Sequence, residues 1–417
     1  MNFELYIAKR LKLGTDSKSG SPGMIIALVG IVLAVVVMIL SIAIVMGFKN
    51  EITDKIYSLD PHVKIYNAVL GIDENYYTVN KRQIYEGLKT QEGVFDRISS
   101  IALFADKPAI LKTQSDFKGV QYRGVDDGFD WTYLQSRLVD GRVPSYADTA
   151  NISEVIISQA IANQLNLKAG DKIPTYFIDT KVKVRNSVIV GIYSSDFESF
   201  DNSIILGNIA LIQQVNDWNA DTGNYVGINV TNVGNVENDA RDIYSILALD
   251  CYNKENSTLF NVTHTRSNNI SFFSWLDMLD MNVVIILTLM LIVSGFTLVS
   301  ALLMIILERI RMIGLLKALG CNNISMRRIF IYLTHKLVFK GLLWGNIIGI
   351  TIAVIQQVFH VIKLNADVYY MPYVPICLNV GVLLLLNLGI VVVSYITLLG
   401  PSYVISTIKP TTIMRFE

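Results

Sequence analysis

The sequence is short of charged residues. Of its 417 residues, 17% are Asp, Glu, Lys or Arg, whereas soluble domains contain about 25%. Acidic and basic residues number 35 each, so the chain has no net charge, and no basic patch favours a nucleic acid partner. Because 52% of the residues are hydrophobic, the composition indicates a membrane protein that carries a large aqueous domain.

Cysteine and histidine are also scarce. The cysteines are Cys251, Cys321 and Cys377. On the topology predicted below they lie at three different levels, so we expect no internal disulfide. The histidines are His62, His264, His335 and His360. None has a metal-ligand spacing to a cysteine or carboxylate, so we expect no metal site and interpret the histidines as surface or interfacial residues.

Sequence patterns of common enzymes are missing. There is no Gly-x-Ser-x-Gly, no His-Glu-x-x-His and no Gly-Lys dipeptide, which excludes the usual phosphate-binding loop of an ATPase. Two carboxylate clusters remain, one at Asp126, Asp127 and Asp130 and the other at Asp196, Glu198 and Asp201. Both adjoin turn residues, so turn chemistry explains them better than catalysis or calcium binding. No residue is predicted to be catalytic.

What the sequence does contain is long uncharged runs. The first, Met24 to Met46, makes about 35 Å of helix, which is enough to cross a hydrocarbon core of about 30 Å. It is too long for a signal peptide and is followed by no cleavage site, so we interpret it as an uncleaved anchor. Further runs predict spans at Met281 to Leu307, Leu337 to Phe359 and Ile376 to Leu399.

A region without long apolar runs separates the first two spans. From about Lys49 to Asn269 the charge content rises, and short strand and helix patterns alternate. Strands are expected at Ile98–Phe104, Ala109–Leu111 and Val182–Ile192, and a helix at Val236–Leu247. More than two hundred residues can bury a core of their own, so we expect an α+β domain here.

Basic residues set the predicted topology. Four precede the first span, five lie within residues 308–328 after the second span, two lie in the C-terminal tail, and one lies in the loop between the third and fourth spans. By the positive-inside rule, both termini face the cytoplasm and the large domain faces outward. The fold class is therefore a membrane protein with four transmembrane α-helices and a large α+β extracytoplasmic domain inserted between the first and second spans.

One short stretch lies between the second and third spans. It reads Glu308-Arg309-Ile310-Arg311-Met312-Ile313-Gly314-Leu315-Leu316-Lys317-Ala318-Leu319-Gly320. Apolar residues recur in it at helical spacing, which is typical of a short amphipathic helix lying on the cytoplasmic side. Such a helix can dock a soluble partner, or it can be a loop held by lipid headgroups, and its periodicity alone favours neither interpretation.

The third span has a face of small residues. Gly341, Gly345 and Gly349 form two overlapping Gly-x-x-x-Gly spacings, which let another helix backbone approach closely. The pattern predicts helix packing at this face, either within one subunit or between subunits.

Residues 308–320 resemble the coupling helix of the MacB/LolC/LolE/FtsX-type ABC transporter permeases, closest to the lipoprotein-releasing LolC/LolE subunits. Further matches are Gly47-Phe48 leading to Pro61-His62, Gly141-Arg142, and the Pro410 to Arg415 ending. The resemblance implies that the ATPase-docking residues are Glu308, Arg309, Met312, Ile313, Gly314, Leu315, Leu316, Lys317, Ala318, Leu319 and Gly320. It also implies a periplasmic domain of porter and sabre type.

The resemblance implies a non-catalytic subunit of an ATP-driven transporter in the bacterial inner membrane. ATP and Mg would be bound by a separate cytoplasmic ATPase, and this chain would bind no cofactor. The other implied partners are a second permease subunit, identical or paralogous, a lipoprotein cargo, a periplasmic carrier and membrane lipid. Because MacB carries an ATPase ahead of its first span and only 23 residues precede the first span here, we expect a LolC/LolE-like or FtsX-like arrangement.

Three functions stay open. The first hypothesis is lipoprotein release toward the outer membrane, driven by ATP through movement of the periplasmic domain. The alternatives are MacB-like efflux or export and FtsX-like signalling to a cell-wall hydrolase. The sequence identifies neither the cargo nor the partner permease. The predicted segments are an N-terminal cytoplasmic segment 1–23, span 1 at 24–48, the domain at 49–270, stalk and span 2 at 271–307, the coupling helix at 308–328, span 3 at 329–359, an outer loop at 360–375, span 4 at 376–399 and a cytoplasmic tail at 400–417.

Overall fold

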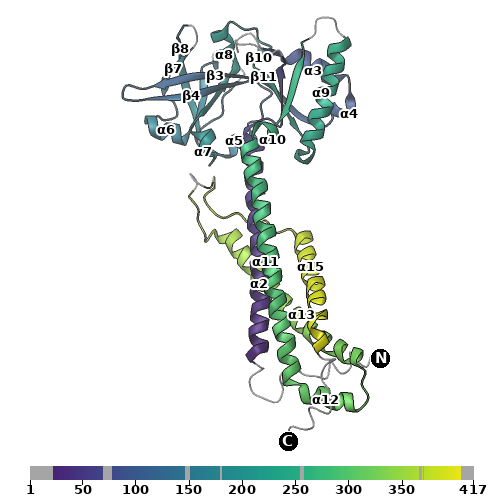
Figure 1. The fold of residues 1–417 in the computed structure, drawn as a ribbon. Coiled ribbons are helices and arrows are strands. Elements are labelled where there is room, and N and C mark those ends of the chain that lie inside the picture. The colour runs from purple at the N-terminus through teal and green to yellow at the C-terminus, as the bar shows by residue number, and fades with distance from the viewer. Residues whose placement is uncertain are drawn as a thin grey trace. The chain divides into compact units, whose positions relative to one another are not determined.

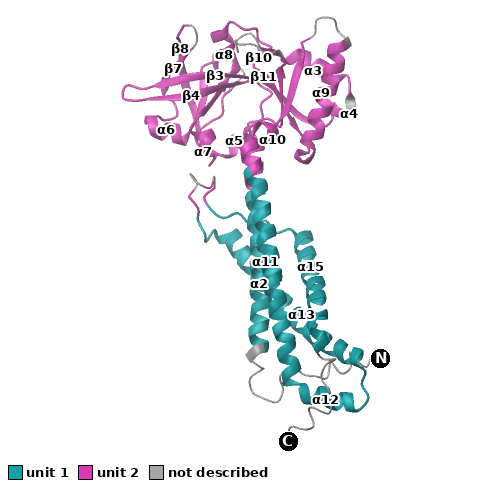
Figure 2. Cartoon of the chain, viewed as in Figure 1, with its two compact units in different colours: residues 1–50, 275–363, 373–417 teal, residues 51–274, 364–372 magenta. Residues whose placement is uncertain are grey.

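The computed structural model describes residues 22–68, 78–145, 151–178, 181–253, 258–365, 369 and 371–404. Most of the predicted cytoplasmic segments 1–23 and 400–417 therefore lies outside the described residues. The chain divides into two compact units (Figure 2). Unit 1 comprises residues 1–50, 275–363 and 373–417, and unit 2 comprises residues 51–274 and 364–372.

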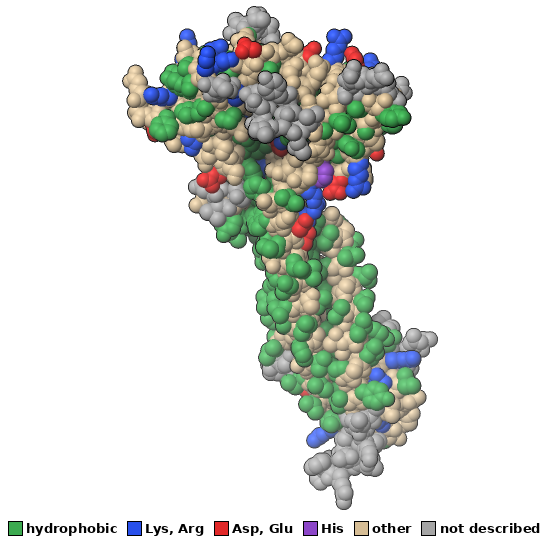
Figure 3. Space-filling view, turned by 45° about the horizontal axis from the view of Figure 1, so that its top comes forward, with side chains coloured by type: hydrophobic (Ala, Val, Ile, Leu, Met, Phe, Trp, Pro, Cys, Tyr) green, Lys and Arg blue, Asp and Glu red, His purple; other side chains and the backbone are tan. Residues whose placement is uncertain are grey.

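Unit 1 is made of helices (Figure 1). They are all or part of α2 (Pro22–Leu59), α11 (Ile270–Glu308), α12 (Ile310–Ala318), α13 (Asn323–Phe359) and α15 (Val380–Leu399), followed by the 3₁₀ turn η4 (Pro401–Tyr403). Four of these helices are long and apolar enough to cross a membrane, and their most apolar windows are only 17–39% buried. Apolar side chains accordingly cover much of the unit 1 surface (Figure 3), as expected for helices that face lipid.

Polar caps set where two of these helices begin. The Asn322 side chain accepts from the backbone N–H of Ile324 at the start of α13, and Asn379 accepts from Gly381 and Val382 at the start of α15. Asparagine is a preferred N-cap because its side-chain oxygen satisfies N–H groups that have no partner in the helix. Since α13 begins at Asn323, the helix break lies at residues 319–322, and residues 323–328 of the predicted coupling segment belong to the start of the third spanning helix.

Unit 2 contains the sheet. Its strands are β1 (Val63–Asn67), β2 (Val79–Asn80), β3 (Ile98–Lys112), β4 (Phe117–Val125), β5 (Leu138–Gly141), β6 (Glu154–Ser158), β7 (Lys172–Phe177), β8 (Lys183–Tyr193), β9 (Ile204–Asn208), β10 (Thr222–Gly223), β11 (Tyr225–Val230) and β12 (Phe260–His264). The main sheet has the order β12-β1-β11-β3-β4-β9-β6-β8-β5, and β7 pairs with both β3 and β8. Most pairs are antiparallel, whereas β4–β9 and β6–β8 are parallel.

Short helices connect these strands. They are α3 (Lys81–Lys89), α4 (Glu92–Phe95), α5 (Thr132–Ser136), α6 (Gln159–Leu165), α7 (Glu198–Asp201), α8 (Ile209–Asn216), the 3₁₀ turn η3 (Val233–Asn235), α9 (Val236–Asn253) and α10 (Thr265–Asn268). Ser158 and Asn208 cap α6 and α8 with their side chains, directly after strands β6 and β9. One hydrophobic core joins the sheet to α3, α6, α8 and α9, so unit 2 is an α+β domain.

The expectation of two strands at Ile98–Phe104 and Ala109–Leu111 was wrong. The structure has one strand, β3, that continues through Pro108. Its pairing explains why the proline is tolerated. On one edge of β3, pairing with β11 ends at Phe104 and pairing with β7 begins at Ala109, so Pro108 lies where that edge has no ladder. A missing N–H costs little at such a position.

Candidate coupling surface

Helix α12 is the stretch that the sequence singles out, and it ends in a well-defined cap. Gly320 has a φ of +91°, the left-handed conformation that glycine adopts without strain. The Cys321 N–H donates to the Leu316 carbonyl and the Gly320 N–H to the Lys317 carbonyl, both at 3.0 Å. This pair of hydrogen bonds is a Schellman motif, which turns the chain sharply toward α13.

The apolar residues of α12 divide between two faces. Ile313 is fully buried in the unit 1 core, and its neighbour Gly314 is also buried. Met312 and Leu316 are half-buried and pack against the same core. The predicted docking residues Ile313 and Gly314 are therefore buried within this chain.

The opposite face of α12 is exposed. Leu315 is 62% exposed and Leu319 77%, and Ile324 at the start of α13 is 56% exposed. Residues four apart lie on the same side of a helix, which places Arg311 with these leucines. We name Arg311, Leu315 and Leu319 the α12 outer face. The sequence predicted Leu315 and Leu319 as docking residues but did not single out Arg311.

The other predicted docking residues lie at the ends of the helix or on its flank. Glu308 is the exposed last residue of α11, and Arg309 is the half-buried N-cap of α12. Lys317 is half-buried, whereas Ala318 and Gly320 are exposed. Of the eleven predicted docking residues, seven thus lie on or next to the α12 outer face. The other four, Met312, Ile313, Gly314 and Leu316, are buried or half-buried.

The glycine face of α13 lies against α2. A Cβ added at Gly341 would lie 2.5 Å from Ile31 Cγ2, one at Gly345 2.7 Å from Val35 Cβ, and one at Gly349 3.2 Å from Ile39 Cδ1. The contacts recur every four residues, or about one turn, along both helices. The close approach that three glycines permit is therefore taken up by another helix of the same chain.

Polar groups inside the spanning helices are satisfied by their neighbours. Asn346 on α13 and Asn387 on α15 form two reciprocal amide hydrogen bonds of 2.7 and 3.0 Å. Each amide also donates to the carbonyl four residues earlier in its own helix. The pair joins α13 to α15, and its satisfied donors indicate a structural role rather than a solute path.

The carboxylate clusters of unit 2 make turns and ion pairs. Asp126 bonds to Lys81 and accepts from the Gly128 N–H, and Asp130 accepts from the Thr132 N–H. Among the residues that the structure describes, no group of three His, Cys, Asp or Glu could hold a metal ion. The geometry is that of local turns.

Asp201 is the buried member of the second cluster. Its carboxylate accepts from the backbone N–H and the hydroxyl of Ser195, at 3.2 and 2.6 Å. Burial raises the pKa of Asp201 to about 6 from 3.8, although the two hydrogen bonds from Ser195 oppose this shift. Compared with the unfolded chain, the folded protein therefore favours the protonated form of the Asp201 carboxyl.

This shift predicts the sign of a pH effect. Because the folded pKa of Asp201 lies above the unfolded value, its stabilising contribution is complete below about pH 4 and is lost as the pH rises to about 6. In Asp201→Asn this loss disappears, so the variant's melting temperature should fall less than that of the wild type between those pH values. The control is Asp127→Asn, an 85% exposed carboxylate. Equal pH profiles for Asp201→Asn and the wild type would contradict the assignment.

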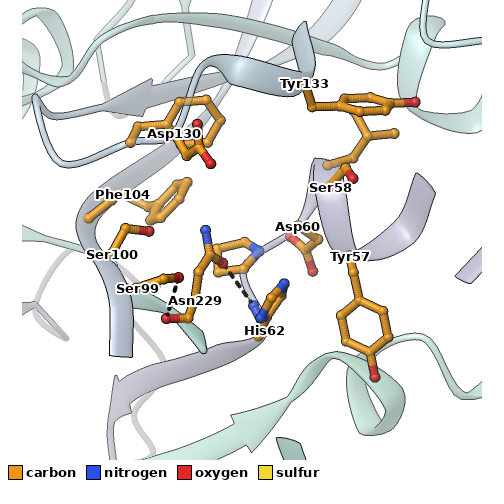
Figure 4. Close-up of a pocket in the computed structure, with 15 residues that line it drawn as sticks. Tyr57, Ser58, Asp60, His62, Ser99, Ser100, Phe104, Asp130, Tyr133 and Asn229 are labelled. Carbon is orange, nitrogen blue, oxygen red and sulfur yellow. Dashed lines mark hydrogen bonds between the residues drawn. The ribbon is translucent and has the colours of Figure 1, made fainter. Parts of the chain in front are cut away.

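A small polar cavity of about 170 Å³ lies in unit 2, next to the C-terminal end of α2 (Figure 4). His62 on its wall is buried, so the expectation that His62 is a surface or interfacial residue was wrong. Its Nδ1 accepts from the Val230 N–H at 3.0 Å, and burial lowers its pKa. The lowered pKa favours the neutral imidazole, and the hydrogen bond links the end of α2 to β11.

Two family models match this chain. The MacB-like periplasmic core domain matches residues 24–243, more than half of the chain, and the FtsX-like permease C-terminal domain matches residues 284–410. The lipoprotein-releasing system transmembrane protein LolC of Neisseria meningitidis serogroup B is 22% identical and aligns over 94% of both chains. The lipoprotein-releasing system transmembrane protein LolE of Haemophilus influenzae is 25% identical over 83% of both chains.

Among solved structures, the periplasmic region of MacB from Actinobacillus actinomycetemcomitans matches 51% of this chain and 92% of that chain. The identity is 12% and the TM-score 0.36, and we draw no conclusion from the superposition.

Four apolar helices and a MacB-like periplasmic domain define a membrane permease. The chain belongs to the family of MacB/FtsX-type ABC transporter permeases, as the match over residues 24–243 shows. Its curated relatives include proteins named LolC and LolE.

Proposed function

We propose that this chain is the permease subunit of an ABC transporter that releases lipoproteins from the inner membrane toward the outer membrane. The observation that carries the proposal is similarity to LolC over 94% of both chains, which covers the spanning helices and the domain together. A separate ATPase supplies the energy, since the sequence contains no Gly-Lys dipeptide and hence no usual phosphate-binding loop.

The proposed topology places the large domain between the first and second spans, on the periplasmic side. Two observations support it. All described strands of unit 2 lie between α2 and α11 in the chain. Among the short segments that flank the spans, basic residues are most frequent in those assigned to the cytoplasm. Both termini and α12 are then cytoplasmic, where the α12 outer face is open to a soluble partner.

The proposed mechanism is mechanical. The ATPase binds the α12 outer face, and its closure on ATP displaces α12 together with the end of α11. Helix α11 continues without interruption from Ile270 to Glu308, so it can transmit the displacement to the periplasmic side as a rod. The amide pair of Asn346 and Asn387 is satisfied within the chain, which fits a device that moves a domain more than one that conducts a polar solute.

Cargo and partners follow from this proposal. The cargo is a lipoprotein whose acyl chains lie in the bilayer, and a periplasmic carrier receives it. A second permease subunit, identical or paralogous, completes the proposed complex. No cofactor is assigned to this chain, and ATP and Mg belong to the ATPase.

Depletion of the protein tests the proposal. Outer-membrane lipoproteins should accumulate in the inner-membrane fraction, measured by density fractionation and immunoblotting, and a plasmid copy should restore their sorting. Normal sorting after depletion would overturn the proposal. Normal sorting with new drug or peptide sensitivity would favour efflux, and normal sorting with defective cell-wall hydrolysis would favour signalling.

A further inference from the structure

Two ion pairs join α2 to α11 at the level where the long uncharged run of each helix ends. Lys49 is the first charged residue on α2 after Met24, and Asp277 and Asp280 are the last on α11 before its uncharged run. The Lys49 ammonium lies 2.5 Å from Asp280 Oδ2 and 3.7 Å from Asp277 Oδ1. Residues three apart lie on the same face of a helix, so both carboxylates lie on the side of α11 that contacts Lys49.

A second contact holds α2 at the same level. A Cβ added at Gly47 would lie 2.5 Å from the Pro375 carbonyl oxygen, so only glycine lets this backbone approach. The Cys377 N–H donates to the Ala43 carbonyl at 3.0 Å, and the Asn50 amide donates to Cys377 Sγ at 3.4 Å. The segment before α15 is thereby packed on α2 beside these ion pairs.

We infer that Lys49, Asp277 and Asp280 form a clamp that makes α2 and α11 move together at the outer boundary of the membrane. The role of the clamp in transporter coupling rests on the proposed function. At about 1.5 Å per residue, α11 is about 42 Å long from Asp280 to Glu308. A displacement of α12 must therefore be transmitted along this length of helix to reach the clamp. With the clamp closed, α2 and the segment beside Gly47 follow α11. With the clamp open, α11 moves alone.

The exposure of the clamp limits its strength. The side chains of Lys49, Asp277 and Asp280 are 37%, 46% and 55% exposed, so each pair contributes modestly and is weakened by salt. Lys49 is thus a positioning residue, and its loss is expected to change coupling rather than folding. Charge reversal is the stronger test because it places three carboxylates together.

The first experiment measures the clamp directly. Spin labels at Val45 on α2 and Met281 on α11, in a cysteine-free full-length protein, report the distance between the helices in detergent. In the parent protein the distance distribution should be narrow. Lys49→Glu should broaden it, and Lys49→Asp combined with Asp280→Lys should restore it. This readout needs neither ATPase nor cargo, so its outcome is independent of the proposed function.

The second experiment measures coupling in the complete transporter. Proteoliposomes containing a purified outer-membrane lipoprotein report the lipoprotein released per ATP hydrolysed. Lys49→Glu should lower this ratio about fivefold, the factor that corresponds to an exposed ion pair of about 1 kcal/mol, and the charge swap should restore it. The control is Arg82→Glu, which reverses the charge of an exposed pair with Glu86 on α3 and should leave the ratio unchanged.

The outcomes separate the two proposals. A narrow distance distribution in Lys49→Glu, or a defect that the charge swap fails to repair, would overturn the clamp. If the protein binds no ATPase and releases no lipoprotein while the distances respond as expected, the proposed function fails and the clamp stands.

Discussion

Replacing Leu315 and Leu319 together by aspartate is expected to weaken ATPase binding about a hundredfold while the protein still inserts and folds. Both side chains are mostly exposed, at 62% and 77%, so the fold loses little when they change. A docked partner would cover them, and burying a leucine contributes about 1.5–3 kcal/mol. Losing about 3 kcal/mol weakens binding about a hundredfold. Pull-down of the ATPase with tagged permease, followed by titration, measures the loss.

Leu249→Asp is the matched control for this prediction. Leu249 on α9 is 58% exposed, but it belongs to unit 2 and not to the α12 outer face. Its substitution makes the same chemical change and should leave the affinity for the ATPase unaltered. If the Leu315→Asp/Leu319→Asp variant bound the ATPase with wild-type affinity, the α12 outer face would not be the docking surface.

Ile313→Asp should behave differently. Ile313 is fully buried in the unit 1 core, so a carboxylate there is an unpaired buried charge that destabilises the folded protein. A substitution at Gly314 would likewise disturb the packing of α12. Loss of function in either variant would be ambiguous, whereas the leucine variant separates docking from folding.

The sequence did not distinguish these two faces. Apolar residues occur on both sides of α12, so periodicity identifies a helix without saying which side packs inward. That choice depends on where α13 begins and which core residues it brings to α12, which are tertiary facts.

Other features could be predicted because local chemistry decides them. Uncharged runs of sufficient length must become helices in a membrane, since no water satisfies their backbone groups. Glycines spaced four residues apart identify a close-packing face, although the sequence did not name α2 as the helix that packs there. By contrast, the burial of His62 depends on the Val230 N–H, which lies 168 residues away in the chain.

Pro108 shows a further limit of local patterns. Proline is unfavourable inside a strand because it donates no ladder hydrogen bond, and the two expected strands leave Pro108 between them. The break is avoided here since two different strands pair with one edge of β3 on either side of Pro108. Only the order of the strands in the sheet reveals that gap.

Gly345→Leu is expected to have the largest effect on stability of the substitutions in the α13 face. Even a single Cβ at Gly345 would lie 2.7 and 2.8 Å from Val35 Cβ and Cγ1 and 3.3 Å from the Val32 carbonyl oxygen. A β-branched side chain has little freedom to move away, so α2 and α13 must separate. Overpacking of this kind costs about 1–3 kcal/mol for added methylenes, and a leucine adds several. Thermal unfolding of the purified protein in detergent measures the loss.

The glycines provide an internal scale for this prediction. Alanine at Gly345 or Gly341 should destabilise more than alanine at Gly349, whose nearest neighbour is the flexible end of Ile39 at 3.2 Å. Gly389 on α15 is the control, because a Cβ there meets no described atom within 4 Å, and Gly389→Ala should be neutral or slightly stabilising. If all four alanine variants melted at the same temperature, close packing of α13 on α2 would be excluded. If Gly345→Leu left the monomer stable but disrupted the association of two permease chains, the glycine face would instead belong to a contact between subunits.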